Sequence, residues 1–361
     1  MRQRVLILCV CSLAACGTEN PPSRTDSGLS HSTDASTGDS GVDAGASDAG
    51  LDAGASDAGF DAGAIDAGSP QPFGCVTNIA AGHHAFSCSA ITYEVEIPPA
   101  CTGGGCGVVF DIHGATMNAA GMEKSTGLRV HGKDAGYVVV QPTAPLTLIG
   151  NSWTPATDDA KVWTFAQQLL KALVIDPKRI HFTGFSQGGA MTWRMVCAHA
   201  DVIASAAPIA AADGQSLTST SPPFALDCPF DSASSPSKQL PILQMHGTAD
   251  GLVPFGKATQ QRDAVIAKWS LGAPAVVSSD AKYSHTRYTS PSGTVFEFIQ
   301  HDYLVPPPLV FVPLQGHCIP GGNDLPANAS LGQTMYFSCA PPNAFAWGPR
   351  VMKFFLDHPR P

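Results

Sequence analysis

The sequence predicts an α/β fold in which a mostly parallel central sheet carries helices on both of its faces. From residue 90 onward, short apolar runs of strand length alternate with longer segments that have helical spacing. Several short runs, such as residues 107–113 (GVVFDIH) and 136–141 (GYVVVQ), are almost entirely apolar. Continuous apolar strands indicate a sheet that is covered on both faces, as parallel sheets are. The stretch 73–361 is long enough to bury one large core.

The expected elements can be placed in order along the chain. Residues 90–98 alternate between apolar and polar and predict an edge strand, and a weak helix at 121–134 separates the two buried strands named above. Thr157, Asp158 and Asp159 predict the start of a helix that runs to about residue 173. The remaining expected strands are 180–185, 203–209, 241–246 and 309–314, and the remaining expected helices are 189–199, 256–270 and 347–358.

The junction of one strand and one helix carries a motif with chemical meaning. Residues 184–188 (GFSQG) match G-x-S-x-G, and Ser186 is the only serine with glycines at both flanking positions. In a nucleophile elbow this pattern holds a serine in a strained conformation that raises its hydroxyl above the sheet. The helix that follows directs its N-terminus at the site, where it stabilises negative charge. The alternative is a glycine-rich turn without a catalytic role.

A serine nucleophile needs a base within hydrogen-bond reach, and the base needs an acid that orients it. Asp250 lies in residues 246–255 (HGTADGLVPF) and His317 in residues 316–318 (GHC), each after an apolar segment. Active sites of α/β proteins collect at that end of the strands, and the order Ser, Asp, His accompanies this elbow. The alternatives are a turn-capping role for Asp250 and a loop position for His317. The competing bases are His285, His301 and His358.

Acyl transfer also requires two backbone N–H groups that face the oxygen that becomes negative. The first expected donor is the N–H of Gln187, directly after the nucleophile. The second comes from the loop after strand 107–113, where we favour Ala115 and keep Thr116 as the competing donor and as a candidate substrate contact. Trp153, in loop 150–154, is expected either to stack on an aromatic acyl group or sugar or to pack in the core.

The first 72 residues differ in composition from the rest. Residues 1–16 begin with two arginines and continue with an apolar run too short to span a bilayer, which is typical of an export signal. Residues 13–16 (LAAC) resemble the lipobox of bacterial lipoproteins and predict lipidation of Cys16; ordinary cleavage nearby is the alternative. Residues 17–72 repeat Asp-Ala-Gly and contain ten acidic residues against one arginine. We therefore expect a flexible spacer rather than calcium sites.

The catalytic domain is expected to span residues 73–361. The formal charge of −9 comes mainly from the spacer, so this domain is close to neutral and offers no basic face for nucleic acid. Eight of the 11 cysteines follow Cys16, and an even number in an exported chain predicts disulfides. No paired C-x-x-C and H-x-x-x-H spacing indicates zinc, and neither a metal nor a cofactor is expected. The expected disulfides are Cys75–Cys88, Cys101–Cys106, Cys197–Cys228 and Cys318–Cys339, with buried free thiols as the alternative.

Four segments occur in order within residues 107–361: DIHGAT, VIDPKRIHFTGFSQGGAM, HGTADGLVP and GHCIPGG. Together they resemble the secreted esterases grouped with polyhydroxybutyrate depolymerases and feruloyl esterases. The resemblance implies an α/β-hydrolase fold and hydrolysis of carboxylic esters through Ser186, Asp250 and His317. GFSQGGA is also similar to small carboxylesterases and acyl-protein thioesterases, which stay as an alternative, as does a catalytically inactive scaffold that binds at the cell surface. We expect an exported monomeric serine esterase that contacts a membrane only through a lipid anchor.

Overall fold

A ten-stranded mixed sheet organises the chain. The computed structural model describes residues 68–148, 150–211, 239–306, 314–321 and 337–361, all within a compact unit that spans Ala62–Pro361. The strands are β1 (Gly82–Cys88), β2 (Ile91–Ile97), β3 (Gly107–Ile112), β4 (Tyr137–Thr143), β5 (Leu146–Thr147), β6 (Gly150–Asn151), β7 (Ile180–Phe185), β8 (Ser205–Ile209), β9 (Ile242–Gly247), β10 (Ala275–Ser279), β11 (Tyr283–Thr289) and β12 (Val295–His301). The helices are α1 (Ala119–Thr126), α2 (Leu128–Asp134), α3 (Thr157–Ala172), α4 (Gln187–His199), α5 (Phe255–Lys268) and α6 (Trp347–Asp357), with a short 3₁₀ helix at Pro99–Cys101.

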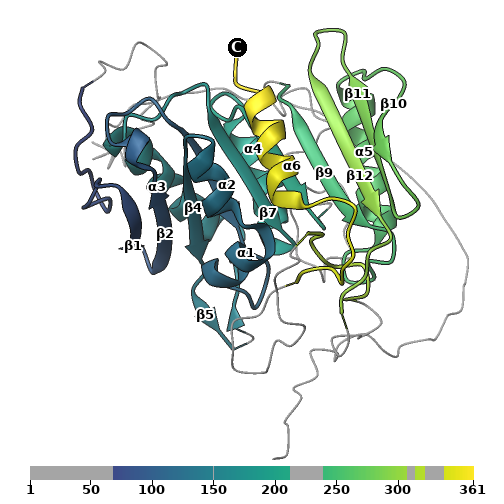
Figure 1. Cartoon of the computed structure of the whole chain (residues 1–361), viewed down its shortest axis with the longest axis horizontal. Helices are drawn as coiled ribbons and strands as arrows, with labels where there is room; N and C mark the ends of the chain where they lie inside the picture. Colours follow the sequence, from purple (N-terminus) through teal and green to yellow (C-terminus); the bar gives the residue numbers. More distant parts are fainter. Residues whose placement is uncertain (1–67, 149, 212–238, 307–313, 322–336) are drawn as a thin grey trace, which may run out of the picture. The chain divides into compact units, whose positions relative to one another are not determined.

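The sheet has the order β1-β2-β4-β3-β7-β8-β9-β12-β11-β10 (Figure 1). The central strands from β4 to β12 pair in parallel, whereas β1 and β2 at one side and β11 and β10 at the other pair antiparallel. β5 and β6 form a separate two-stranded hairpin after β4. A central parallel sheet of this kind brings the carboxyl ends of β3, β7, β8 and β9 to one edge, where the site described below lies.

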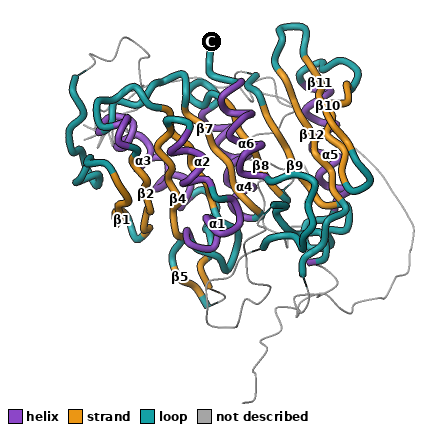
Figure 2. The backbone as a smooth tube through the Cα atoms, viewed as in Figure 1, coloured by secondary structure: helices purple, strands orange, loops and turns teal. Residues whose placement is uncertain are grey.

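Helices cover both faces of this sheet, as the continuous apolar strands predicted (Figure 2). On one face, Phe110 of β3 and Phe182 of β7 pack in a cluster that includes residues of α3, α4 and α5. On the other face, Val109 of β3 packs in a cluster with residues of α1, α2 and α6. Successive residues of β3 therefore enter different cores, because side chains alternate across a strand. These features are those of the α/β-hydrolase fold.

Three sequence predictions about elements need comment. The expected helix at 121–134 is two helices, because Gly127 adopts a left-handed conformation (φ 62°) that ends α1 and precedes α2. Most of the strand expected at 309–314 lies outside the described residues. β1, β10, β11 and β12 were not among the expected strands. In the structure His285 and Arg287 of β11 both hydrogen-bond to Glu297, which allows this carboxylate to be buried.

β10 is the last strand at one side of the sheet and pairs with β11. Its register shifts between Val276 and Ser278, which marks a bulge. Val276 and Val277, at this irregularity, are both exposed.

Three of the expected disulfides are present, namely Cys75–Cys88, Cys101–Cys106 and Cys318–Cys339. Cys197 is disulfide-bonded, and its expected partner Cys228 lies outside the described residues. The predicted export signal, Cys16 and nearly all of the Asp-Ala-Gly spacer also lie outside them. In the part of the chain that the structure describes, no helix combines the length and apolarity needed to cross a membrane.

Candidate active site

Ser186 occupies the sharp turn between β7 and α4. Its backbone is left-handed, with φ 54° and ψ −117°, which is a strained conformation for a residue with a side chain. The flanking glycines are required by packing. A Cβ atom on Gly184 would lie 2.4 Å from the Gly188 carbonyl oxygen, and one on Gly188 would lie 2.0 Å from that of Ile112. The G-x-S-x-G spacing therefore builds a sharp strand-to-helix turn with the geometry of a nucleophile elbow, and the catalytic role of Ser186 stays a prediction.

Asp250 and His317 meet although they are far apart in sequence. The Asp250 carboxylate accepts a hydrogen bond from His317 Nδ1 at 2.7 Å, and both side chains are buried. Its other oxygen accepts the backbone N–H groups of Leu252 and Val253, at 3.0 and 2.9 Å. Because the carboxylate fixes the proton on Nδ1, Nε2 of His317 keeps its lone pair and can accept a proton.

The His317 side chain lies beside the turn that carries Ser186. The His317 ring packs against Phe185, the residue before the serine, with 4.6 Å between ring centroids, and Phe337 contacts both rings. Within the described part of the chain no hydrogen bond joins the Ser186 hydroxyl to His317, and this contact is often long in enzymes without substrate. The structure thus pairs Asp250 with His317 and places Ser186 next to the residue on which His317 packs.

The loop after β3 passes directly over the elbow. A Cβ atom on Gly114 would lie 2.9 Å from the Phe185 ring and 3.1 Å from Ser186 Cβ. The Thr116 N–H is already used, because it donates to the Asn151 carbonyl at 2.7 Å. Ala115 is therefore better suited than Thr116 to donate to a substrate oxygen. Gln187 is the first residue of α4, where a backbone N–H has no acceptor within the helix.

Gln187 also holds the neighbouring loop through its side chain, a role the sequence did not reveal. Its Oε1 accepts the Ser152 hydroxyl at 3.0 Å and the Trp153 N–H at 3.1 Å. The Trp153 indole N–H in turn donates to the His113 carbonyl at 2.8 Å, and the ring is only 4% exposed. Trp153 therefore braces the loop that carries Ala115; contact between this ring and a substrate stays a prediction.

His113 completes this support. Its Nδ1–H donates to the Gly114 carbonyl at 2.6 Å, and its Nε2 accepts the Ala144 N–H at 3.0 Å. Burial lowers the pKa of His113 to about 4, so the ring stays neutral and keeps both bonds at neutral pH. Apart from the bond to the adjacent Gly114, these contacts join residues 31 to 40 positions apart, and no local sequence pattern signals them.

Two of the three competing histidines are bound elsewhere. His285 of β11 hydrogen-bonds to Glu297 at 2.6 Å, and β8, β9 and β12 separate its strand from β7. His358, just after α6, bonds to the Phe354 carbonyl at 2.8 Å. His301 is buried at the end of β12. His317 is therefore the histidine best placed to act on Ser186.

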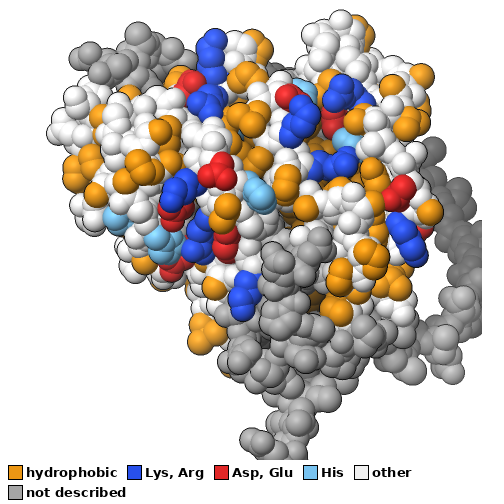
Figure 3. Space-filling model, in the orientation of Figure 1, with side chains coloured by type: hydrophobic (Ala, Val, Ile, Leu, Met, Phe, Trp, Pro, Cys, Tyr) orange, Lys and Arg blue, Asp and Glu red, His pale blue; other side chains and the backbone are white. Residues whose placement is uncertain are grey.

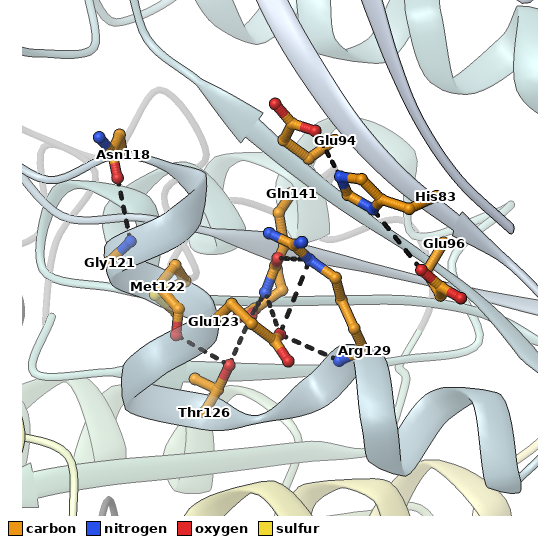
Figure 4. Close-up of polar contacts among 11 residues, drawn as sticks. His83, Glu94, Glu96, Asn118, Gly121, Met122, Glu123, Thr126, Arg129 and Gln141 are labelled. Carbon is orange, nitrogen blue, oxygen red and sulfur yellow. Dashed lines mark hydrogen bonds and ion pairs between the residues drawn. The ribbon is translucent and has the colours of Figure 1, made fainter. Parts of the chain in front are cut away.

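A second polar group connects β4 with α1 and α2 (Figure 4). Gln141 of β4 donates to Glu123 at 2.9 Å and accepts from Arg129 at 2.6 Å, and Figure 4 shows these side chains and Thr126 turned toward one another. Gln141 and Thr126 both also donate to the buried Asp111 carboxylate at 2.8 Å. Burial raises the pKa of Asp111 to about 7. This network joins α1 and α2 to the sheet. The same figure shows His83 between Glu94 and Glu96 on the edge hairpin.

Acidic and basic side chains are interspersed on the face that carries α1, α2 and α6 (Figure 3). Among the described residues no group of three or more His, Cys, Asp or Glu side chains is arranged to hold a metal ion.

Comparison with known proteins points to esterases. The sequence pattern of the family Phospholipase/Carboxylesterase matches residues 157–299, which include Ser186 and Asp250. Feruloyl esterase B of Piromyces equi is 32% identical over 119 residues, covering 31% of this chain and 20% of that protein. The bifunctional acetylxylan esterase/xylanase XynS20E of Neocallimastix patriciarum is 22% identical over 189 residues, covering 52% of this chain and 25% of that protein.

Among solved structures, the acetyl xylan esterase from Aspergillus awamori matches with a TM-score of 0.47 and 14% identity, over 58% of this chain and 87% of that one. The chain spans less than half the length of the curated relatives it matches. The chain, whose sheet topology is that of an α/β-hydrolase, is thus similar in sequence to esterases.

Proposed function

We propose that this protein is a serine esterase in which Ser186, His317 and Asp250 form the catalytic triad. The observation that carries the proposal is the 2.7 Å hydrogen bond between Asp250 and His317 beside a strained serine turn. A carboxylate that orients a neutral imidazole, which in turn lies next to a raised serine, is the arrangement that makes a hydroxyl nucleophilic. The matches to esterases support the same reaction class.

The reaction follows from these positions. His317 Nε2 takes the hydroxyl proton as Ser186 Oγ attacks the ester carbonyl carbon. The backbone N–H groups of Ala115 and Gln187 stabilise the negative oxygen of the tetrahedral intermediate. When the intermediate collapses, His317 gives its proton to the departing alcohol and leaves an acyl-enzyme. A water molecule then repeats the sequence and releases the acid. This chemistry uses no metal and no cofactor.

We further propose that the protein is exported. The predicted signal at 1–16 and the disulfides support this location, because disulfides persist in oxidising compartments. Lipidation of Cys16 would tether the domain through the acidic spacer.

The substrate we favour is an acyl group esterified to a plant cell-wall polysaccharide. The support is that the relatives that match include a feruloyl esterase and an acetylxylan esterase. Hydroxyalkanoate oligomers, suggested by the motif resemblance, are the competing substrates. A panel of methyl ferulate, acetyl-xylan and a polyhydroxybutyrate suspension would separate these classes.

A small carboxylesterase or thioesterase is the second candidate, because the matching family pattern is that of phospholipases and carboxylesterases. Rates on an oxyester and a thioester of the same acyl group would distinguish the two.

The triad is tested with p-nitrophenyl acetate and butyrate and with a fluorophosphonate probe. We expect Ser186→Ala to abolish both hydrolysis and labelling, whereas Ser87→Ala, an exposed serine on edge strand β1, should leave both unchanged. Asp250→Asn should lower kcat by about 10⁴, as loss of the orienting acid does in other triads. Full activity in Ser186→Ala would show that the nucleophile is assigned wrongly. Absence of labelling in the unmodified protein would favour a binding scaffold.

A further inference from the structure

His246 lies at the carboxyl end of β9, four residues before Asp250, and its side chain is fully buried. Its Nε2 is 2.7 Å from the Val253 carbonyl oxygen. A carbonyl only accepts hydrogen bonds, so Nε2 must carry the proton. The same Nε2 is 3.4 Å from Oδ2 of Asp250, the carboxylate oxygen that binds His317.

These contacts form a closed set around the carboxylate. The Val253 N–H donates to Oδ1 of Asp250, and the Val253 carbonyl accepts from His246. The Nε2 atom of His246 also lies against Oδ2, at an ion-pair distance and not in a hydrogen bond. This imidazole therefore fixes the backbone turn that presents Asp250, and it packs beside the carboxylate oxygen that binds His317.

Other titratable groups face this region from neighbouring elements. His301, at the end of β12, is buried, and its Cε1 would lie 3.0 Å from a Cβ atom placed on Gly247. Asp302 accepts a hydrogen bond from the Thr248 hydroxyl at the surface. Besides His317, His246 is the histidine that approaches the Asp250 carboxylate to within 4 Å in the described chain. Burial lowers the pKa of His246, which agrees with a neutral ring that donates from Nε2.

We propose that His246 is a positioning residue: by donating its Nε2–H to the Val253 carbonyl, it fixes the turn that presents the Asp250 carboxylate to His317 Nδ1–H. The proposal rests on the triad described above. It assigns to the first residue of the HGTAD segment a role in the reaction, whereas a buried histidine that serves only the core would affect stability alone.

Two substitutions at this position separate the alternatives. The side-chain amide of Gln can place an N–H near the position of Nε2, whereas the shorter Asn cannot. We expect His246→Asn to lower kcat for p-nitrophenyl butyrate by about 10- to 100-fold with little change in KM. We also expect the acid limb of its pH–rate profile to move to lower pH, because an imidazole that loses its carboxylate partner binds a proton less tightly. His246→Gln should stay within about 5-fold of the unmodified enzyme and keep its acid limb.

His181→Asn is the matched control, because His181 is equally buried but lies near the start of β7. It should lower stability without moving the acid limb. The proposal is overturned if the Gln and Asn variants lose activity equally, if the acid limb stays fixed in His246→Asn, or if the control moves it too. Failure of the unmodified protein to hydrolyse any ester or to label at Ser186 would instead refute the proposed function.

A measurement on the unmodified protein keeps the test independent of variant folding. Nitrogen-15 NMR of labelled histidines reports which ring nitrogen carries the proton. We expect His246 to carry it on Nε2 throughout pH 6 to 9. A His246 protonated only on Nδ1 could not donate to the Val253 carbonyl from Nε2 and would rule the proposal out.

Discussion

Substitution of Gly188 by alanine tests how closely the turn at Ser186 packs against the end of β3 and the loop that carries Ala115. The added Cβ would lie 2.0 Å from the Ile112 carbonyl oxygen and 2.6 Å from that of His113, whereas ordinary contacts begin near 3.4 Å. Both obstacles are backbone atoms, so no side-chain rotation relieves them. The end of β3 and the first turn of α4 must therefore move apart by more than about 1 Å.

The expected cost is at least about 3 kcal/mol, at the upper end of the range for overpacked cores. For a domain of this size that corresponds to a melting temperature lower by roughly 6–12 °C. The same displacement moves the loop that carries Ala115, and loss of one oxyanion donor typically lowers kcat by roughly 10²–10³. Thermal unfolding and ester hydrolysis would measure the two effects separately.

Gly256→Ala is the matched control, because nothing lies within 4 Å of a Cβ atom at that position in α5. It should leave kcat unchanged and stability unchanged or higher by up to about 1 kcal/mol. A Gly188→Ala protein that melts within about 2 °C of the unmodified one and keeps its kcat would refute the reasoning about this contact.

Three other predictions concern the buried polar groups. Trp153→Phe leaves the His113 carbonyl without its indole donor, so we expect a stability loss of about 1–3 kcal/mol in urea unfolding and a lower kcat. Burial lowers the pKa of His113 to about 4, below the value of 6.5 expected in the unfolded chain. The stability that the neutral ring contributes is therefore fully present above pH 6.5 and should be lost as the pH falls toward 4. Calorimetry at a series of pH values would detect this loss. Burial raises the pKa of Asp111 from 3.8 to about 7. Ionisation of this carboxyl group should therefore lower the stability of the folded protein as the pH rises from about 4 to 7. Relative to the unmodified protein, Asp111→Asn should gain melting temperature over that interval, and a difference that does not change with pH would contradict this.

Features with a local signal could be proposed from the sequence. Ser186 was selected because steric limits at a sharp turn demand glycines at fixed spacing, and Asp250 and His317 because each follows an apolar segment. The structure contains the turn at Ser186 and the Asp250–His317 hydrogen bond, and the catalytic roles stay predictions. The parallel arrangement of the central sheet followed from continuous apolar strands such as β3 and β4.

The supporting residues were not predictable in the same way. Gln187 accepts bonds from residues 34 and 35 positions away, and Trp153 donates to a carbonyl 40 positions away. Such contacts depend on how loops approach one another in space, and neither residue differs locally from an ordinary helix or loop residue. β12 was not expected either, and the partners that allow its Glu297 to be buried lie on another strand.

The irregular β10 influences how the protein behaves when it is concentrated. A free edge strand offers unpaired N–H and C=O groups to which a strand of a second molecule can add, and exposed valines would strengthen that contact. The register shift at Val276 and Ser278 breaks the even spacing that a continuous intermolecular ladder needs. Deleting Val277 to restore that spacing should therefore make the protein more prone to form fibrils.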